Sequence, residues 1–357
     1  MDIALANDEY YFVGLWSTVL SLLSSTPDAS SLRIHVIDTG ISDASWKRLS
    51  HAVARHPAPP KLLRKIFPRE RLDGLDIPGT ISPLVYARLF LPELLDCDRV
   101  LYLDSDLLVF RNVLELENID LSDHACAAVI NEDAGTLDFD LSKQEYTELN
   151  LDPKSNYYNA GLLYMNLDYW RSHDFTSKCL DFLKNHQFRL ADQSALNAVM
   201  NEKILPIDRQ WNRHASHLST ADIVSPHSVI HYTLDKPWRL NSDAPAMLLW
   251  NKFTQDTKLA ILPPRQKVNI FERYMPLNIL RIIHYGSRAL WCSIFNKQAS
   301  ASGYVYAFSY WVTYCAERKM RAREFATAAQ KIYSKNYGPD WLLGAHESAE
   351  NKENSDH

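Results

Sequence analysis

The chain has 357 residues, 46% of them hydrophobic and 23% charged, a balance that predicts a large globular domain with a sizeable core. Its net charge of −5 argues against a nucleic-acid partner, since an acidic surface repels phosphates. The five cysteines are widely spaced without a C-x-x-C pair, which indicates neither a disulfide framework nor a zinc knuckle. No signal peptide and no run of 18 apolar residues occurs, so we expect a cytoplasmic protein.

The first part of the chain alternates between strand and helix patterns. Residues 2–6 and 32–37 predict strands, and residues 12–23 and 42–53 predict helices, the second with Ser42 as its N-cap. Repeated alternation of this kind predicts an α/β fold with a twisted, mostly parallel sheet flanked by helices. Neither G-x-x-x-x-G-K-[ST] nor G-x-G-x-x-G occurs, which argues against a P-loop or a dinucleotide-binding site.

The most informative segment is RVLYLDSDLLVF at residues 99–110. Residues 100–103 predict a buried strand, and Asp104 and Asp106 follow it on the same side of the chain, separated by Ser105. Two neighbouring carboxylates repel each other unless a divalent cation lies between them, and such a cation also binds substrate phosphates. The alternative is a solvated turn at the end of the strand.

The last hundred residues differ in composition from the rest. Residues 264–337 carry twelve Lys or Arg against three Glu, a balance of +9, together with the aromatic stretch 301–316. Residues 263–345 are therefore predicted to form a basic aromatic helical tail, which favours docking on an anionic membrane surface. An amphipathic helical cap on the main domain, or a contact with a partner, would have a similar composition. Residues 346–357 are predicted to be disordered.

Several segments resemble glycosyltransferase family 8 and occur in the order seen there. They are DIALANDEYY, VYARLFLPELL, LYLDSDLLV, YYNAGLLYMNLDYWR, ADQSALN and IHYTLDKPW. The resemblance is closest to the bacterial lipooligosaccharide galactosyltransferases and glucosyltransferases. It implies a GT-A type, Rossmann-like domain over residues 1–262 and retaining transfer of galactose or glucose from UDP-galactose or UDP-glucose. The acceptor would be a saccharide of a cell-envelope glycan such as lipopolysaccharide, linked to lipid, at the inner face of the membrane.

The resemblance implies that Asp104, Asp106 and His231 bind Mn²⁺, with Mg²⁺ as the alternative. Oxygen ligands with one imidazole suit Mn²⁺ better than Mg²⁺. In the family the lysine of the KPW segment, here Lys236, contacts the diphosphate, and the arginine of YARL, here Arg88, lies near the donor sugar. From residue type alone, His231 could be a core histidine and the two cations could be surface residues.

The resemblance also places the uridine at the end of the first strand. Ala6 and Asp8 would contact the uridine and Tyr11 would offer an aromatic face to the base, while Ser105 also belongs to the donor site. Tyr10 departs from the family, where a small amide is common. Asp8 alone could equally be a helix cap.

Further resemblance concerns the donor sugar. Asn159, Ala160 and Gly161 match the N-A-G segment and would line the sugar, or else form a turn. Asn131 stands where the family commonly has an aspartate that contacts the sugar, and the loop between His231 and Lys236 lacks the family's glycine.

Asp192 and Gln193 match the family's D-Q pair near the anomeric carbon, although Asp192 could merely cap a helix. A further aspartate often follows this pair, and Ser194 replaces it here. Because an amide is a poor nucleophile, these residues favour front-face attack over double displacement. The alternative functions are a self-glucosylating, glycogenin-like initiator, a metal-dependent nucleotidyltransferase or nucleotide-sugar phosphohydrolase, and an inert nucleotide-sugar-binding protein.

Overall fold

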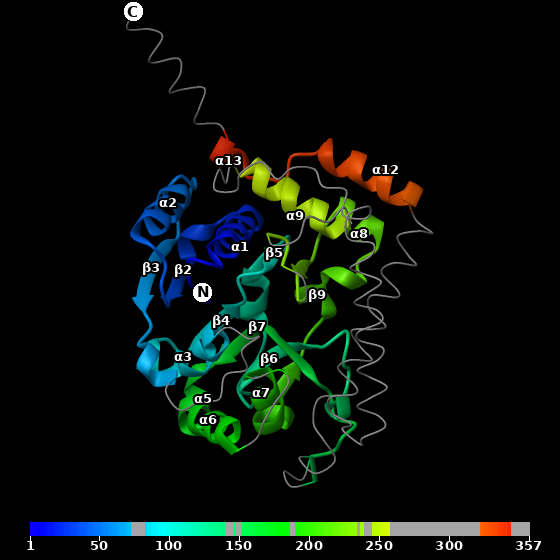
Figure 1. The fold of residues 1–357 in the computed structure, drawn as a ribbon. Coiled ribbons are helices and arrows are strands. Elements are labelled where there is room, and N and C mark those ends of the chain that lie inside the picture. The colour runs from blue at the N-terminus through cyan, green and yellow to red at the C-terminus, as the bar shows by residue number, and fades with distance from the viewer. Residues whose placement is uncertain are drawn as a thin grey trace, which may run out of the picture.

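The computed structural model describes residues 1–72, 83–139, 146–147, 151–185, 190, 192–233, 236–238, 245–257 and 322–343. The predicted domain boundary at residue 262, the aromatic stretch 301–316 and the acidic end at 346–357 lie outside these residues. Figure 1 shows the described elements around a central sheet.

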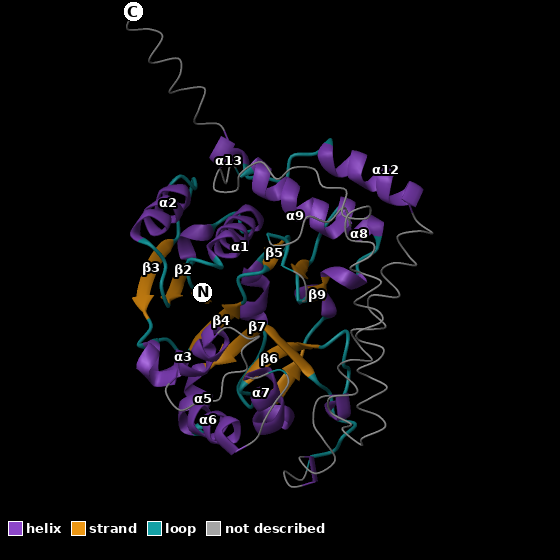
Figure 2. Cartoon of the chain, in the orientation of Figure 1, coloured by secondary structure: helices purple, strands orange, loops and turns teal. Residues whose placement is uncertain are grey.

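The strands are β1 (Asp2–Asn7), β2 (Arg33–Asp38), β3 (Lys61–Ile66), β4 (Arg99–Leu103), β5 (Leu107–Val109), β6 (Cys126–Ile130), β7 (Tyr158–Asn166), β8 (Ile204–Pro206), β9 (Arg213–His214) and β10 (Val229–His231). The helices are α1 (Phe12–Ser25), α2 (Asp43–Ala54), α3 (Leu91–Leu94), α5 (Leu167–Ser172), α6 (Phe175–Asn185), α7 (Asp192–Met200), α8 (Thr220–Val224), α9 (Pro245–Asp256), α12 (Ala322–Tyr333) and α13 (Asp340–Leu343). Figure 2 distinguishes the two classes by colour.

Seven strands form the main sheet in the order β3-β2-β1-β4-β7-β6-β8. The first four are parallel, and β7 runs antiparallel to both of its neighbours, β4 and β6. The predicted mixed α/β fold with a mostly parallel sheet is therefore confirmed. A smaller sheet of three strands, β5-β10-β9, begins directly after β4.

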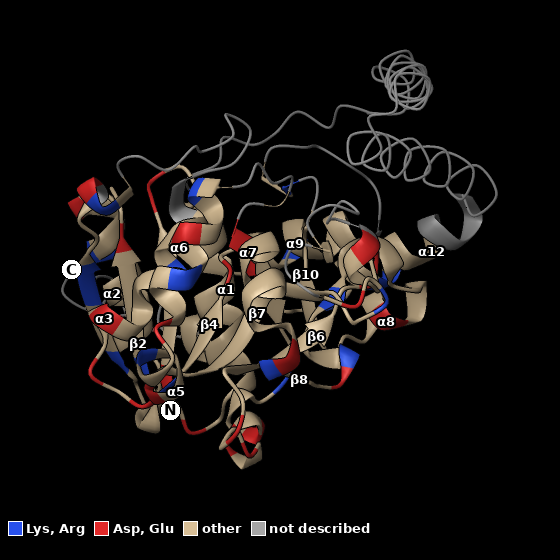
Figure 3. Ribbon diagram, turned by 90° about the horizontal axis from the view of Figure 1, so that it is seen from below, with Lys and Arg blue, Asp and Glu red and all other residues tan. Residues whose placement is uncertain are grey.

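The main sheet is covered by helices on both faces (Figure 1). Alternate residues of β7 point to opposite faces: Leu162 and Tyr164 pack in the cluster with α1, α2 and α9, and Leu163 and Met165 pack in the cluster with α3, α5, α6 and α7. Figure 3 shows charged residues mainly on the surrounding helices and loops, while β4 and β7 are tan along most of their length. Burial on both faces explains why these strands read as continuous apolar runs.

Local signals account for the first elements of the fold. The Ser42 side chain accepts a hydrogen bond from Ser45 N at 3.2 Å, so the predicted N-cap of α2 is confirmed. Helix α1 lies against the start of β5, where Thr18 Oγ1 donates to Leu107 O at 2.9 Å and accepts from Leu107 N at 3.2 Å. These bonds fix the segment between β4 and β5 against the helix.

The described part of the tail packs on the main domain. Ile332 and Leu342 are buried, Arg55 Nη2 donates to Leu342 O at 2.8 Å, and Tyr337 N donates to Asp256 Oδ2 at 2.8 Å. Residues 322–343 therefore form a cap over α9 and α2. Among the described helices, none combines the length and the apolar character needed to cross a bilayer.

Candidate functional site

Residues 104–106 form a turn between β4 and β5 rather than a continuation of the strand. Asp104 N donates to Gly161 O at 2.8 Å, which continues the pairing of β4 with β7, and Ser105 Oγ donates to Ala6 O at 3.3 Å. Helix α1 comes very close to this turn, because a Cβ atom at Gly14 would lie 2.0 Å from Ser105 O. The turn is thus held between the ends of β1 and β7 and the first turn of α1.

The short sheet explains how His231, 125 positions away from Asp106, reaches the same place. Strand β10 pairs antiparallel with β5, with His231 opposite Leu107, and Tyr232 N donates to Asp106 O at 3.0 Å. His231 Nε2 consequently lies 3.3 Å from Asp106 Oδ1 and 3.9 Å from Asp104 Oδ2. The side chain of Asp106 is only 7% exposed, so the turn is not solvated at that residue.

The atoms of this cluster fit a metal ion. Asn212 Oδ1, which only accepts hydrogen bonds, lies 2.9 Å from His231 Nδ1, so Nδ1 carries the proton and the lone pair of Nε2 faces the carboxylates. Asp106 Oδ1 is buried and has no hydrogen-bond partner. A lone pair and a carboxylate oxygen 3.3 Å apart repel each other, and a cation removes this repulsion. Asp104, Asp106 and His231 could therefore hold a divalent ion.

Because Gly161 has no side chain, it leaves the space that the imidazole of His231 fills. A Cβ at this position would lie 2.1 Å from His231 Cε1. Asn159 Oδ1 accepts hydrogen bonds from Gly161 N and from Asn212 Nδ2, each at 2.8 Å. The predicted N-A-G segment therefore lies within β7, not in a turn, and it positions His231 through Asn212. Sequence reasoning missed Asn212, because a single asparagine beside a tryptophan carries no motif signal.

Lys236 contacts Asp106 directly. Its ammonium group forms an ion pair with Asp106 Oδ2 and donates to Tyr232 O at 2.9 Å. Burial raises the pKa of Asp106, but the ion pair with Lys236 outweighs burial, and the pKa lies well below its usual range. Burial lowers the pKa of Lys236, but the neighbouring Asp106 carboxylate raises it by a larger amount, so the net shift is upward. Both groups are therefore ionised near neutral pH.

Arg88 lies in the interior and connects two carboxylates. Its Nη2 donates to Asp104 Oδ1 at 2.9 Å, its Nε lies 2.8 Å from Asp192 Oδ2, and Nη1 donates to Ala160 O. Its side chain is 3% exposed, so it is not a surface cation. Burial raises the pKa of Asp192 to about 7, although Arg88 acts in the opposite direction. Asp192 is thus the first residue of α7 and also the partner of Arg88.

Helix α7 brings Gln193 to the N-A-G segment. Gln193 Oε1 accepts from Ala160 N at 3.0 Å, and Nε2 donates to Tyr157 Oη at 3.3 Å. Asn197, one turn later, accepts from Tyr158 N at 2.7 Å and so holds the helix against β7. The structure therefore joins Arg88, Asp192 and Gln193 to the strand that carries Asn159, Ala160 and Gly161.

The residues predicted for uridine lie near the same turn. Ala6, the next-to-last residue of β1, accepts the bond from Ser105, and the Tyr11 ring meets the Trp238 ring edge-on with centroids 5.5 Å apart. Asp8 Oδ1 accepts from Tyr11 N at 2.9 Å, so its side chain fixes the turn that precedes α1, whose N-cap is Tyr11 and has no side-chain capping bond. Tyr10, the departure from the family pattern, is 58% exposed.

Asn131 follows β6 and shapes its own turn. Its Oδ1 accepts from Asp133 N at 2.9 Å and from Ala134 N at 3.2 Å. These bonds are typical of an asparagine that fixes a turn. Asn131 and Asp8 are therefore the two predicted site residues whose side-chain bonds lie within their own loops.

Comparisons with known proteins agree with this geometry. Glycosyl transferase family 8 matches residues 2–242, and the chain belongs to this family. It is similar to the lipopolysaccharide 1,3-galactosyltransferase of Salmonella typhimurium, with 25% identity over 250 residues that cover 66% of this chain and 72% of that protein. It is also similar to the probable galacturonosyltransferase-like 10 of Arabidopsis thaliana, with 29% identity over 280 residues that cover 70% of this chain and 75% of that protein.

A crystal structure of the galactosyltransferase LgtC, in complex with donor and acceptor sugar analogs, has a similar fold. The TM-score is 0.60 with 25% sequence identity, and the match covers 74% of this chain and 98% of that one. The domain is accordingly a GT-A glycosyltransferase fold, and the predicted family is confirmed.

Proposed function

We propose that the chain is a Mn²⁺-dependent, retaining transferase that moves galactose or glucose from UDP to a saccharide of a cell-envelope glycan such as lipopolysaccharide. The observation that carries the proposal is the buried, unpartnered Asp106 Oδ1 that faces the lone pair of His231 Nε2 at 3.3 Å. The similarity to a lipopolysaccharide 1,3-galactosyltransferase supports galactose and an envelope acceptor.

Asp104, Asp106 and His231 would hold the ion. Carboxylate oxygens with one imidazole suit Mn²⁺ better than Mg²⁺, which demands an almost purely oxygen environment. When bound, the ion supplies Lewis-acid stabilisation of the negative charge that grows on the departing diphosphate. Asn212 keeps His231 in the tautomer that presents Nε2.

Lys236 would supply the second positive charge. It neutralises Asp106 in the structure, and a bound cation would take over that task. The ammonium group would then be free to donate to the diphosphate oxygens as the bond to the sugar breaks. Ala6, Asp8, Ser105 and Tyr11 would complete the nucleotide site at the end of β1.

Asn131, Asn159, Ala160 and Gly161 would line the sugar, with Asp192 and Gln193 beside its anomeric carbon. The carboxylate of Asp192 is 5% exposed and paired with Arg88, and the amide of Gln193 is bonded to Ala160 N. Neither group is therefore disposed as a nucleophile, which supports front-face attack by the acceptor hydroxyl over double displacement. Arg88 would orient Asp104 and Asp192 together.

The test is release of UDP from UDP-galactose and from UDP-glucose, with and without lipooligosaccharide, followed by structural analysis of the product. We expect acceptor-dependent release with one of the two donors, Mn²⁺ dependence, and an α-linked product from the α-linked donor. Equal release without acceptor would indicate a phosphohydrolase, a sugar attached to the protein itself would indicate a self-glucosylating initiator, and either result would contradict the proposal.

For location, we propose a cytoplasmic protein that attaches peripherally to anionic membrane through residues 263–345, on the basis of the +9 balance at residues 264–337. Because residues 322–343 pack on the domain, truncation would disturb the fold. Replacement of the basic cluster at 318–323 with glutamine is the cleaner change. It should reduce binding to phosphatidylserine vesicles and leave transfer to soluble oligosaccharides intact. Unchanged vesicle binding would contradict an electrostatic attachment.

A further inference from the structure

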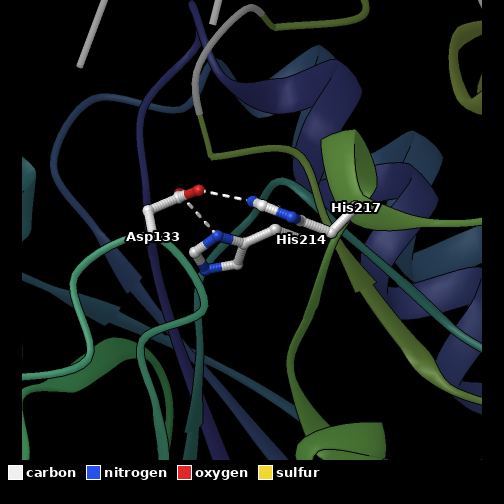
Figure 4. A group of neighbouring side chains, drawn as sticks. All are labelled: Asp133, His214 and His217. Atoms are coloured by element: carbon white, nitrogen blue, oxygen red, sulfur yellow. Dashed lines mark hydrogen bonds and ion pairs between the residues drawn. The ribbon is translucent and has the colours of Figure 1, made fainter. Parts of the chain in front are cut away.

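A second cluster of metal-ligand type lies next to the site described above. Asp133, in the turn after β6, meets His214 of β9 and His217 of the following 3₁₀ helix, as Figure 4 shows. Asp133 Oδ2 lies 2.8 Å from His214 Nδ1, and Asp133 Oδ1 lies 2.5 Å from His217 Nε2. One ligand atom from each residue falls within 4.8 Å of the other two.

We propose that Asp133, His214 and His217 form a second metal site, selective for a zinc-like transition metal. Two imidazole nitrogens and one carboxylate oxygen are a donor set typical of Zn²⁺ and of its neighbours Co²⁺ and Ni²⁺. The first cluster has the opposite ratio, two carboxylates and one imidazole, which favours Mn²⁺. The two sites would therefore prefer different ions.

The second cluster sits on a preformed support. Glu132 Oε1 accepts from Arg213 Nε at 2.7 Å, and Glu132 Oε2 accepts from His214 N at 2.7 Å. These bonds join the turn after β6 to β9 without using any of the three ligand atoms. A site whose ligands come from two separate segments thus has a fixed geometry before an ion binds, which lowers the cost of ordering it.

Exposure gives the cluster an inner and an outer side. The side chain of His214 is fully buried, Asp133 is 12% exposed and His217 is 44% exposed. His214 Nε2 is buried with no hydrogen-bond partner. An ion would enter from the side of His217, where water can complete its coordination.

The position suggests a supporting role beside the transfer site. Strand β9 runs parallel to β10 with His214 next to His231, and the two rings meet edge-on with centroids 5.9 Å apart. An ion bound by His214 would stiffen the segment that also carries Asn212, the partner of His231. This inference does not rest on the proposed function, because the ligand set alone defines the site.

The test is zinc binding to the full chain, measured by equilibrium dialysis and elemental analysis. In a background of Asp104→Asn with Asp106→Asn, which removes the carboxylates of the first cluster, we expect one bound Zn²⁺ per chain. Adding His217→Ala should weaken that binding by about tenfold or more, as expected for the loss of a metal contact. Adding His227→Ala, a change at an exposed histidine outside the cluster, should leave binding unchanged.

Circular dichroism checks that each variant is folded. If the variant with both aspartates replaced by asparagine does not fold, the stoichiometry of the wild-type chain gives the same answer. We then expect two bound Zn²⁺ per wild-type chain and one per chain after His217→Ala. Absence of bound Zn²⁺ in the folded background would overturn the proposal, as would equal affinity with and without His217. Because none of these readouts involves transfer, failure here leaves the proposed function unaffected.

Discussion

The two clusters of carboxylates and histidines lie on neighbouring strands and differ in how their charges are satisfied. In Asp133–His214–His217, both carboxylate oxygens are hydrogen-bonded to imidazole nitrogens at 2.8 and 2.5 Å. In Asp104–Asp106–His231, the imidazole bonds to Asn212 through Nδ1, and Asp106 Oδ1, which faces the other ring nitrogen, has no hydrogen-bond partner. The carboxylate of the second cluster is therefore bonded within its own cluster, whereas the first cluster depends on positive charge from elsewhere.

This difference shows the consequence of burying the Asp106 carboxylate in the first cluster. A carboxylate buried without partners is costly, so a structure that keeps one near an imidazole lone pair is organised for an incoming cation. Lys236 supplies part of the missing charge through Asp106 Oδ2. The first cluster therefore has lower stability than it could have, which is the arrangement expected of the proposed divalent-ion site.

The largest effect should come from removing Lys236, which separates its role from that of the metal ligands. Lys236→Ala should lower the rate of transfer by about one to three powers of ten, because one preorganised charge on the leaving group is lost. Affinity for Mn²⁺ should stay the same or rise, since Asp106 loses a competing partner. Parallel measurement of steady-state rates and Mn²⁺ titration checks both, with Lys203→Ala, an exposed lysine, as control. A fall in Mn²⁺ affinity would contradict this division of roles.

The next effect concerns the orientation of His231. Asn212→Leu keeps the volume but removes the acceptor for His231 Nδ1, so Mn²⁺ affinity should fall by roughly 10–100-fold. Asn201→Leu is the matched control, because Asn201 is another buried asparagine whose side chain bonds to Asn156 O at 2.7 Å, outside the cluster. Calorimetric titration with Mn²⁺ measures the affinity of each variant. Equal affinities in the two folded variants would show that the Asn212 bond does not orient the ligand.

A smaller effect should appear in the pH dependence of stability. The pKa of Asp192 is raised by burial from 3.8 to about 7, so the folded state favours the protonated form. The resulting stability is fully present below about pH 4 and is lost as the pH rises through about 7, by at most about 4 kcal/mol at about 1.4 kcal/mol per pKa unit. Asp192→Asn should flatten this loss between pH 5 and pH 8 in thermal unfolding. An unchanged slope would show that Asp192 is ionised throughout.

Much of the fold could be predicted from local patterns. Residues 2–6 lie in β1, all but the first of residues 32–37 lie in β2, residues 12–23 lie in α1, and Ser42 caps α2, because periodicity and capping are local properties of the chain. The strand that ends at Leu103 could also be predicted, because a strand buried on both faces requires a continuous apolar run. Residues 104–106 were expected in strand periodicity but form a turn, whose shape depends on Ser105 and Gly14 meeting in space.

Residues of the candidate site could be predicted only where they belong to a recognisable sequence motif. The two aspartates were found from their spacing after an apolar strand, and His231 and the N-A-G segment through the resemblance. The pairing of β5 with β10 explains why His231 meets the aspartates. Asn212 and the buried position of Arg88 depend on contacts between distant segments, which no local pattern encodes. The second cluster was missed for the same reason: Asp133 lies 81 positions before His214.

The central claim is that Asp104, Asp106 and His231 bind Mn²⁺ together with UDP, and electron paramagnetic resonance of Mn²⁺ tests it most directly. Titration of the wild-type chain with Mn²⁺ should remove the signal of the free ion, and UDP should tighten this binding. Asp106→Asn, which keeps the size of the side chain but removes its charge, should restore the free-ion signal at the same concentrations. Undiminished Mn²⁺ binding by a folded Asp106→Asn variant would contradict the account.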